Sequence, residues 1–392
     1  MTAPGDPAGQ AAAEKPVLLE LTTLRFAAAV AVLLGHFNHY IGFPILLGRA
    51  ISGGWGVSFF FVLSGFILCY RYWDDFAGGV RGGAYRNYFV ARVARVYPSY
   101  VMALVLITML YVVMDLSRPG FAGFPPNPVT SWLANLLALQ TFAPSYETQQ
   151  FWNAPGWSIS TEFAFYALCP FILAAIARGC RTGRSLAIVF LASLAFGIVA
   201  HGVVLYLVRI RGWDEGHWQY LVSARNIVWR LPQFITGIVF ARLLMGGHLP
   251  WLAKAGARNA LLLAGLVGVL VMNVAPVPTE TRFDAALRQL RMDFLYMIPF
   301  GLVVVAAAAG RTFASPVLRH PAGVFLGEIS YAVYIYHWIA WMMLAFAARL
   351  GTPVTPLAAW GTMAAVLAAS ALSYLAFERP ARAWIRRRFS GP

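Results

Sequence analysis

Residues 18–41 read LLELTTLRFAAAVAVLLGHFNHYI, a largely apolar run whose ionisable residues are Glu20, Arg25, His36 and His39. About 20 mostly apolar residues form a helix long enough to cross a hydrocarbon core, so this stretch predicts a transmembrane helix. Similar runs recur along the chain, which is 60% hydrophobic and 11% charged. That composition excludes an ordinary soluble protein and predicts an all-α, polytopic membrane protein.

Hydropathy predicts ten membrane spans and leaves no room for a separate soluble domain. A shorter apolar stretch, Trp132 to Phe142, is predicted to be interfacial or re-entrant. The predicted spans cover residues 18–41, 54–72, 96–114, 157–177, 185–208, 226–245, 260–276, 292–310, 324–349 and 357–377.

Arginine placement predicts the orientation, because short cytoplasmic loops carry an excess of Arg and Lys. Arginines gather in segments 71–95 and 178–184 and in the tail after Phe377, so both termini are predicted to be cytoplasmic. Segments 115–156, 209–225 and 277–291 are then outside. The predicted organisation is a disordered cytoplasmic tail (1–17), a transmembrane domain (18–378) and a basic cytoplasmic tail (379–392) of a multi-pass protein in the cell membrane.

The formal charge of +15 therefore has an explanation that needs no nucleic-acid partner. The three cysteines, Cys69, Cys169 and Cys180, lack metal-ligand spacing and are interpreted as apolar fillers. The sequence has no His-Glu-x-x-His pair, glycine-rich phosphate loop or serine nucleophile elbow, so no metal is predicted.

Arg25 and His36 form the strongest candidate pair. Eleven residues turn a helix roughly 20° past three full turns, so both side chains share one stripe, roughly 16 Å apart along the axis. Arg25 is placed to meet an anionic ligand, while imidazole suits proton transfer near neutral pH. The structural alternative is a snorkelling arginine and a core histidine.

Arg92 and Arg95 lie three residues apart on one predicted helix face at the cytoplasmic surface. Arginine forks bind phosphate well, so the phosphates of coenzyme A (CoA) are candidate ligands. Positive-inside topology and binding of anionic lipid are the competing explanations.

Glu162 is predicted at a depth similar to that of His36, where a carboxylate can orient an imidazole. A capping or interhelical hydrogen bond is the alternative. His337 lies near mid-membrane in an aromatic setting, and it either lines an acyl channel or bonds across helices.

Six segments in chain order resemble the acyltransferase-3 family of membrane O-acyltransferases. They resemble its Arg-x10-His signature, its second-helix motif, its Arg-x-x-Arg motif, its Trp-Ser-Leu-Ser-Val-Glu block, its late helix motif and its closing Glu-x-Pro. In this chain they are Arg25 to His36, Gly56 to Ile67, Arg92 to Arg95, Trp157 to Glu162, Ile329 to His337, and Glu378 to Pro380. Many members carry a Glu and a Gln after the position of Glu162, where this chain has Phe163 and Ala164.

The resemblance implies acyl-CoA, often acetyl-CoA, as donor and His36 as the residue essential for transfer, either as base or as acyl carrier. It implies catalytic roles for Arg25 and Glu162 and donor binding by Arg25, Arg92 and Arg95. Further motif residues are predicted to line a substrate channel: Ser64, Trp157, Ser160, Tyr331 and His337.

The predicted function is transfer of an acyl group onto a hydroxyl of a carbohydrate or glycosylated acceptor. The predicted partners are the lipid bilayer and that acceptor, whose identity the sequence leaves open together with the oligomeric state. A transporter or flippase that uses the intramembrane Arg, His and Glu as a substrate or proton path is the alternative.

Overall fold

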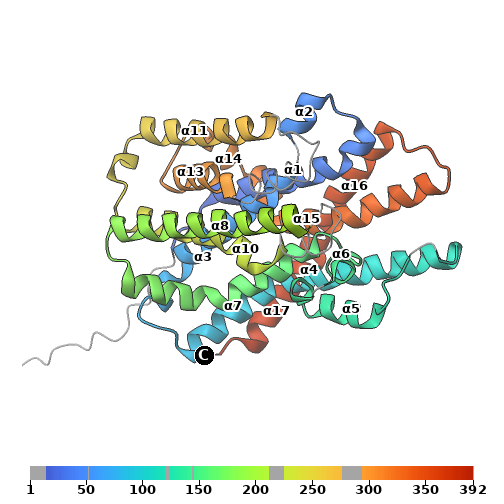
Figure 1. Ribbon diagram of the computed structural model, residues 1–392, viewed down its shortest axis with the longest axis horizontal. Coiled ribbons are helices and arrows are strands. Elements are labelled where there is room, and N and C mark those ends of the chain that lie inside the picture. Colours follow the sequence, from blue (N-terminus) through green and yellow to red (C-terminus); the bar gives the residue numbers. More distant parts are fainter. Residues whose placement is uncertain are drawn as a thin grey trace, which may run out of the picture.

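Helices make up the fold of this protein throughout the part that the computed structural model describes, residues 15–51, 53–120, 123–143, 145–211, 225–275 and 294–391 (Figure 1). Over these ranges there is no strand, and nine helices are long and apolar enough to cross a membrane. The predicted all-α, polytopic class is confirmed. The long helices are α1 (Leu19–Ile41), α3 (Gly54–Phe76), α4 (Gly82–Ser117), α7 (Gly156–Gly179), α8 (Gly183–Arg211), α10 (Ile227–Met245), α11 (Ala255–Val274), α15 (Pro321–Arg349) and α16 (Pro356–Ser373).

Shorter elements join or extend these helices. The predicted interfacial stretch, residues 132–142, is divided, because α5 ends at Leu136 and a 3₁₀ turn begins at Gln140. Between them Ala138 has a φ of 53°, a left-handed conformation that stops the helix. The short elements are α2 (Ile45–Ala50), α5 (Pro128–Leu136), η1 (Gln140–Phe142), α6 (Tyr146–Gln150), η2 (Pro250–Ala253), α13 (Met297–Ala308), α14 (Ser315–Leu318), η4 (Tyr374–Glu378) and α17 (Arg379–Phe389).

The predicted span at 292–310 corresponds to α13, a helix of 12 residues. Helices α1 and α15 pack in parallel: Gly327 lies against Thr22, and His337 lies against His36 further along both helices. Within the described ranges, six long helices and the shorter apolar helix α13 lie between α1 and α15, and the tenth predicted crossing remains a prediction. Most of the predicted tail 1–17 and of the predicted outer loops 209–225 and 277–291 lies outside the described residues.

Helix α3 lies at the centre of the bundle, in contact with α1, α7, α10 and α13. Its crossing with α10 depends on Gly65 and Gly237. A Cβ on Gly65 would overlap the carbonyl oxygen of Phe234, and a Cβ on Gly237 would overlap that of Val62. Glycine lets two membrane helices approach to backbone contact, so these two residues fix how closely α3 and α10 pack.

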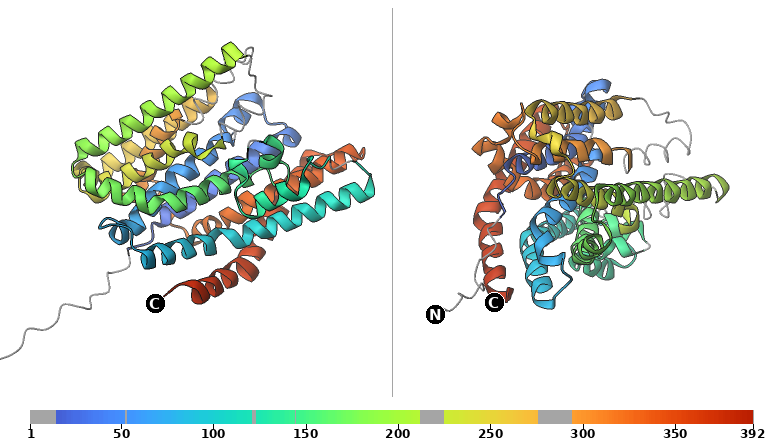
Figure 2. Two further views of the ribbon diagram at one scale, coloured as in Figure 1. Left: turned by 60° about the horizontal axis from the view of Figure 1, so that its bottom comes forward. Right: turned by 90° about the vertical axis from the view of Figure 1, so that its left-hand side faces the viewer.

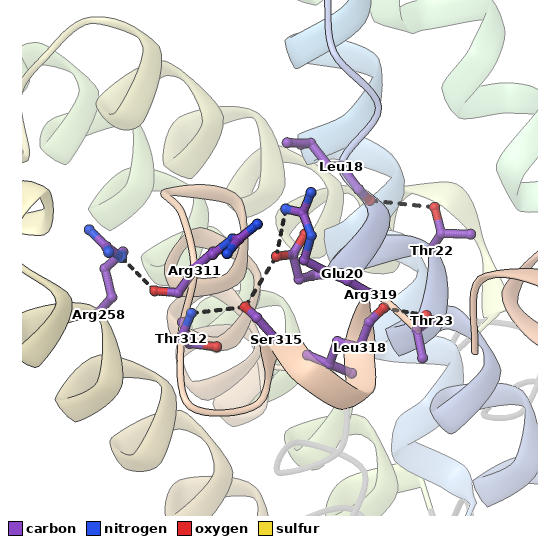
Figure 3. A network of polar contacts seen from close by, with 10 residues as sticks. All are labelled: Leu18, Glu20, Thr22, Thr23, Arg258, Arg311, Thr312, Ser315, Leu318 and Arg319. Carbon is purple, nitrogen blue, oxygen red and sulfur yellow. Dashed lines mark hydrogen bonds and ion pairs between the residues drawn. The ribbon is translucent and has the colours of Figure 1, made fainter. Parts of the chain in front are cut away.

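A polar network fixes the start of α1 against α14 and thereby against α15 (Figure 3). Glu20 Oε1 accepts hydrogen bonds from Ser315 Oγ and Arg319 Nη1, both at 3.2 Å. Thr23 Oγ1 donates to the Leu318 carbonyl at 2.7 Å. Because a helix is rigid along its axis, this anchor sets the register of α1 and α15 where His36 meets His337.

The helices α4 and α17 both extend further than the sequence predicted. Helix α4 begins at Gly82, well before the predicted span at 96–114, so Arg92 lies on a continuous helix. The predicted basic tail 379–392 is mostly the helix α17, which follows α16 through η4 and lies beside α4 (Figure 2). Gly391 N donates to Asn87 Oδ1 at 2.8 Å, which ties the end of α17 to the start of α4. We call this end of the bundle, where α1 and α4 begin and α17 lies, the arginine-rich end.

Candidate active site

Two histidines from α1 and α15 form a direct pair. His337 Nε2 lies 3.1 Å from His36 Nδ1, and the ring centroids are 5.0 Å apart. The His337 side chain is 0% exposed, whereas His36 is accessible at the surface. His36 can therefore meet a reactant while His337 supports it from behind.

The hydrogen bonds of this pair define its tautomers. His337 Nδ1 lies 2.5 Å from the Tyr334 carbonyl, so it carries the proton and leaves Nε2 as an acceptor. His36 Nδ1 lies against that acceptor and also 3.0 Å from the Val32 carbonyl, so it too carries its proton. A neutral imidazole has one proton, and the lone pair of His36 is therefore on Nε2. An imidazole held in this way is oriented as a general base.

Two tryptophans of α15 complete the surroundings of His36. Trp341 Nε1 donates to the His36 carbonyl at 3.1 Å, and the edge of Trp338 packs against the imidazole with centroids 5.5 Å apart. These contacts hold both the backbone and the ring of His36. The helix α15 thus supplies a hydrogen-bond partner and an aromatic wall to the same residue.

A cavity of about 120 Å³ lies between α1, α3, α4, α7 and α15, and we call it the inner cavity. Both arginine and carboxylate side chains line it, which is costly in a membrane protein and typical of functional sites. The polar residues on its wall are Arg25, Ser64, Arg92, Arg95, Ser158, Glu162, Tyr166, Ser330, Tyr331 and Tyr334. The structure therefore gathers most of the sequence-predicted site residues around one space.

Glu162 belongs to the wall of the inner cavity. Its Oε1 atom accepts hydrogen bonds from Tyr166 OH at 2.7 Å and from Ser64 Oγ at 2.9 Å. The partner of His36 is His337 instead, so the orienting group expected from the sequence is supplied by a second imidazole. A carboxylate with two fixed donors keeps its position in the cavity wall.

Arg92 and Arg95 do not act as one fork, because each has different partners. Arg95 Nη1 lies 3.1 Å from Glu328 Oε2 and 3.7 Å from Glu378 Oε1, so two carboxylates neutralise it. Arg92 donates to Tyr72 OH at 2.8 Å and lies over that ring, while its buried Nε has no hydrogen-bond partner. Arg92 is therefore the better placed of the two to bind an anion.

Arg25 lines the inner cavity from α1. No hydrogen bond or ion pair of its side chain is formed with any of the described residues, in contrast to Arg95. A guanidinium inside a membrane protein is expensive without a counter-charge. Arg25 thus has its binding capacity available for a ligand.

A second cavity, of about 460 Å³, opens at the arginine-rich end and shares Arg25, Ile67, Arg92 and Arg95 with the inner cavity. We call it the entry cavity. Its charged lining residues are Arg25, Arg71, Arg92, Arg95, Glu328, Arg382 and Arg386. The sequence did not predict a role for Glu328 or for the α17 arginines, although Glu328 was recognisable as a charged residue inside an apolar run.

An aromatic pair separates the inner cavity from the histidines. Phe60 and Tyr334 line that cavity and pack edge to face, with centroids 5.7 Å apart. The His337 ring lies 5.9 Å beyond the Tyr334 ring. Neither His36 nor His337 lines the inner or the entry cavity. The Tyr334 ring therefore lies between the inner cavity and the His337 ring, and Phe60 packs against it.

Besides His337, two further predicted channel residues lie away from both cavities. Ser160 is fully buried and its Oγ lies 2.7 Å from Thr141 Oγ1, a contact that attaches η1 to α7. The Trp157 ring packs against the guanidinium groups of Arg225 and Arg230, at 5.7 and 5.2 Å from its centroid. A channel role for Ser160 and Trp157 remains a prediction. Within the described ranges, no three His, Cys, Asp or Glu side chains are grouped as a metal site requires.

Comparison with known proteins gives one consistent result. A family model described as an acyltransferase domain matches residues 18–376. The chain is 26% identical to Acyltransferase MdmB of Streptomyces mycarofaciens, over 95% of this chain and 93% of that protein. It is also 26% identical to Exopolysaccharide production protein ExoZ of Rhizobium meliloti, over 89% of this chain and 94% of that protein. A Staphylococcus aureus protein named as an O-acetyltransferase is 20% identical over 81% of this chain and 50% of its own length. No solved structure matches.

Proposed function

The chain belongs to this acyltransferase family, and we propose that it is a membrane O-acyltransferase that moves an acyl group from acyl-CoA to a hydroxyl of a carbohydrate or glycosylated acceptor. The observation that carries the proposal is the His36–His337 pair, which uses Nδ1 of an exposed His36 and leaves its Nε2 lone pair free. The name of the relative ExoZ, which refers to exopolysaccharide production, supports a carbohydrate acceptor.

The two cavities support a donor that carries phosphates. Arginines bind phosphate by charge-assisted hydrogen bonds, and the entry cavity offers them at the arginine-rich end. Its overlap with the inner cavity at Arg25 and Arg92 gives a route inward for the pantetheine arm of CoA. The thioester then reaches the Phe60–Tyr334 pair, and His36 lies beyond it. Movement of Phe60, which lacks a hydrogen bond to hold it, opens the last part of this route.

The proposed reaction is a direct acyl transfer. His36 Nε2 takes the proton of the acceptor hydroxyl while the oxygen attacks the thioester carbonyl carbon. The tetrahedral intermediate collapses with cleavage of the C–S bond, and the imidazolium returns the proton to the departing thiolate. The products are an ester and free CoA. His337 Nε2 accepts the hydrogen bond from His36 Nδ1 throughout and favours the charge that develops on the ring.

In an alternative route, a variant of this reaction, the acyl group is first transferred to His36 itself. In that variant Nε2 attacks the thioester carbonyl carbon, the C–S bond breaks, and CoA departs as its thiolate, which leaves an acyl-imidazolium on His36. The acceptor hydroxyl then attacks the acyl carbon, the C–N bond breaks to restore neutral His36, and the hydroxyl proton passes to the thiolate. The exposed position of His36 admits either reactant. Labelling of His36 when acyl-CoA is supplied without acceptor distinguishes the variant from direct transfer.

Purified protein in lipid nanodiscs, supplied with acetyl-CoA labelled in the acetyl group, tests the proposal. We expect release of free CoA thiol together with a labelled ester on a polysaccharide or glycoside acceptor. The absence of both, over a panel of acyl-CoA donors and glycan acceptors, would contradict it. Uptake of a solute into liposomes by the same preparation would instead favour the transporter alternative.

Replacement of His337 should slow transfer without removing the base. His337→Phe keeps an aromatic ring in the buried site but takes away the acceptor for His36 Nδ1. We expect kcat to fall by about 10²-fold, because a misplaced catalytic group costs on that order, with KM for acyl-CoA little changed. His337→Gln, which can still offer an acceptor, should recover part of kcat. Equal kcat for His337→Phe and the wild type would show that His337 does not position His36.

Replacement of Arg25 should act on donor binding. Arg25→Ala removes a guanidinium that has no protein partner within the described residues, so no buried carboxylate is left unpaired. Hydrogen bonds to charged groups contribute about 1.5–3 kcal/mol, so KM for acyl-CoA should rise by about 10- to 100-fold. Arg49→Ala, on the short helix α2, is the matched control and should leave KM unchanged. An unchanged KM in Arg25→Ala would exclude Arg25 from the donor site.

A further inference from the structure

The C-terminal helix α17 is fixed to the bundle. Glu378, the last residue of η4, accepts a hydrogen bond from Ser99 Oγ at 2.9 Å and pairs with Arg95. At the other end Gly391 N is bonded to Asn87. The helix packs against α4 between these two points (Figure 2). Its side chains therefore have defined positions relative to the cavities.

Two arginines of α17 face the entry cavity. Arg382 and Arg386 are four residues apart, so they share one face of the helix, and both line that cavity. Arg387 and Arg388 are exposed on other faces and do not line it. In the part of the chain that the structure describes, the side chains of Arg382 and Arg386 make no hydrogen bond or ion pair.

The charges around the entry cavity are strongly unbalanced. Among the described residues, Arg25, Arg92, Arg95, Arg382 and Arg386 line it with one carboxylate, Glu328, which is bonded to Arg95 and to Tyr374 OH, each at 3.1 Å. Like charges gathered around a cavity repel one another, and a bound anion with several charges relieves this repulsion. With about 460 Å³ the cavity is within the size range of ligand sites.

We infer that Arg382 and Arg386 form a phosphate-binding site at the mouth of the entry cavity, which takes the 3′-phosphate of the CoA moiety. The inference rests on the proposed function for the identity of the donor. Arg25 and Arg92, where the two cavities overlap, are left for the pyrophosphate nearer the thioester. The C-terminal helix is thereby part of the donor site.

A phospholipid headgroup carries the same chemistry, but the shape of the space favours the nucleotide. The entry cavity continues into the inner cavity through Arg25 and Arg92. A ligand that fills both must have phosphates at one end and a narrow polar arm at the other. CoA has this form, whereas the two long acyl chains of a phospholipid do not fit an inner cavity of about 120 Å³.

Binding to the full-length protein in detergent without anionic lipid tests the inference. The probes are CoA, dephospho-CoA, which lacks the 3′-phosphate, and adenosine 3′,5′-bisphosphate, measured by calorimetry. The wild type should bind CoA about 10- to 100-fold more tightly than dephospho-CoA. R382Q/R386Q should remove this preference and the binding of the bisphosphate. The control R387Q/R388Q, with the same change in charge on the same helix, should keep both.

Each outcome has one meaning for the site. Equal affinity of the wild type for CoA and dephospho-CoA, or an undiminished preference in R382Q/R386Q, would overturn the inference. A further outcome is that CoA binds in nanodiscs of neutral lipid but not in nanodiscs of anionic lipid. This result would assign the site to lipid headgroups and would also overturn the inference. Because these measurements need no acyl transfer, a preference for CoA that depends on Arg382 and Arg386 would support the site even if the transfer assay failed.

Discussion

His36→Ala is expected to lower the rate of acyl transfer by about 10²- to 10⁴-fold, the usual contribution of a general base. The reason is geometric, because Nε2 of His36 is the one ring nitrogen of the pair left with a free lone pair. The variant should still bind CoA, since the arginines of both cavities are unchanged. Steady-state transfer of labelled acetyl groups and calorimetric binding of CoA, measured on the same preparation, separate the two effects.

His39 offers a matched control for this experiment. It lies on the last turn of the same helix, is exposed, and packs against Tyr40 rather than against α15. His39→Ala should transfer at the wild-type rate. If His36→Ala retains transfer at a rate like that of His39→Ala, while both remain folded, the base is a different residue and the proposed mechanism fails.

Glu378→Ala is expected to destabilise the fold by about 3 kcal/mol, the cost of breaking a buried ion pair. Glu378 is 0% exposed, accepts from Ser99 Oγ, and is one of two carboxylates that neutralise Arg95. Its removal leaves the buried Arg95 guanidinium with Glu328 as its one carboxylate partner. It also leaves the Ser99 hydroxyl without its acceptor. The measurement is the midpoint of thermal unfolding in detergent, followed by size-exclusion chromatography after heating.

Three further variants make this second experiment interpretable. Glu378→Gln keeps an acceptor for Ser99 and should be less damaging than alanine. Replacing the whole charged group, R95M/E328Q/E378M, removes the three charges together and should recover much of the stability. Glu147→Ala, at an exposed site on α6, should change the midpoint little. A midpoint for Glu378→Ala equal to that of Glu147→Ala would show that the ion pair does not support the fold.

The membrane spans were predictable because they follow from local composition. Almost every predicted span corresponds to a long helix, since about 20 apolar residues have no other stable form in a bilayer. Helix ends were harder to predict. Helix α4 begins at Gly82 because a helix can continue into the polar surface, where hydropathy gives no signal. The helix described within the span predicted at 292–310 has 12 residues, so this tenth crossing remains a prediction.

The sequence allowed individual site residues to be predicted, but not which side chains contact one another. Periodicity places Arg25 and His36 on one stripe because both belong to one helix. The partner of His36 lies 301 residues away, a distance over which no local pattern operates. The neutralisation of Arg95 by Glu328 and Glu378 likewise depends on three different helices meeting. The role of α17 escaped prediction because a basic tail after the last span is also typical of ordinary membrane topology.

The Phe60–Tyr334 pair has a consequence for the host cell as well as for the reaction. A polar passage lined with arginines and joined directly to a surface histidine would conduct protons and small ions along the membrane potential. Two aromatic rings packed edge to face between them act as an electrical insulator when no substrate is bound. A polar site inside a membrane protein is in this way compatible with a closed path for ions.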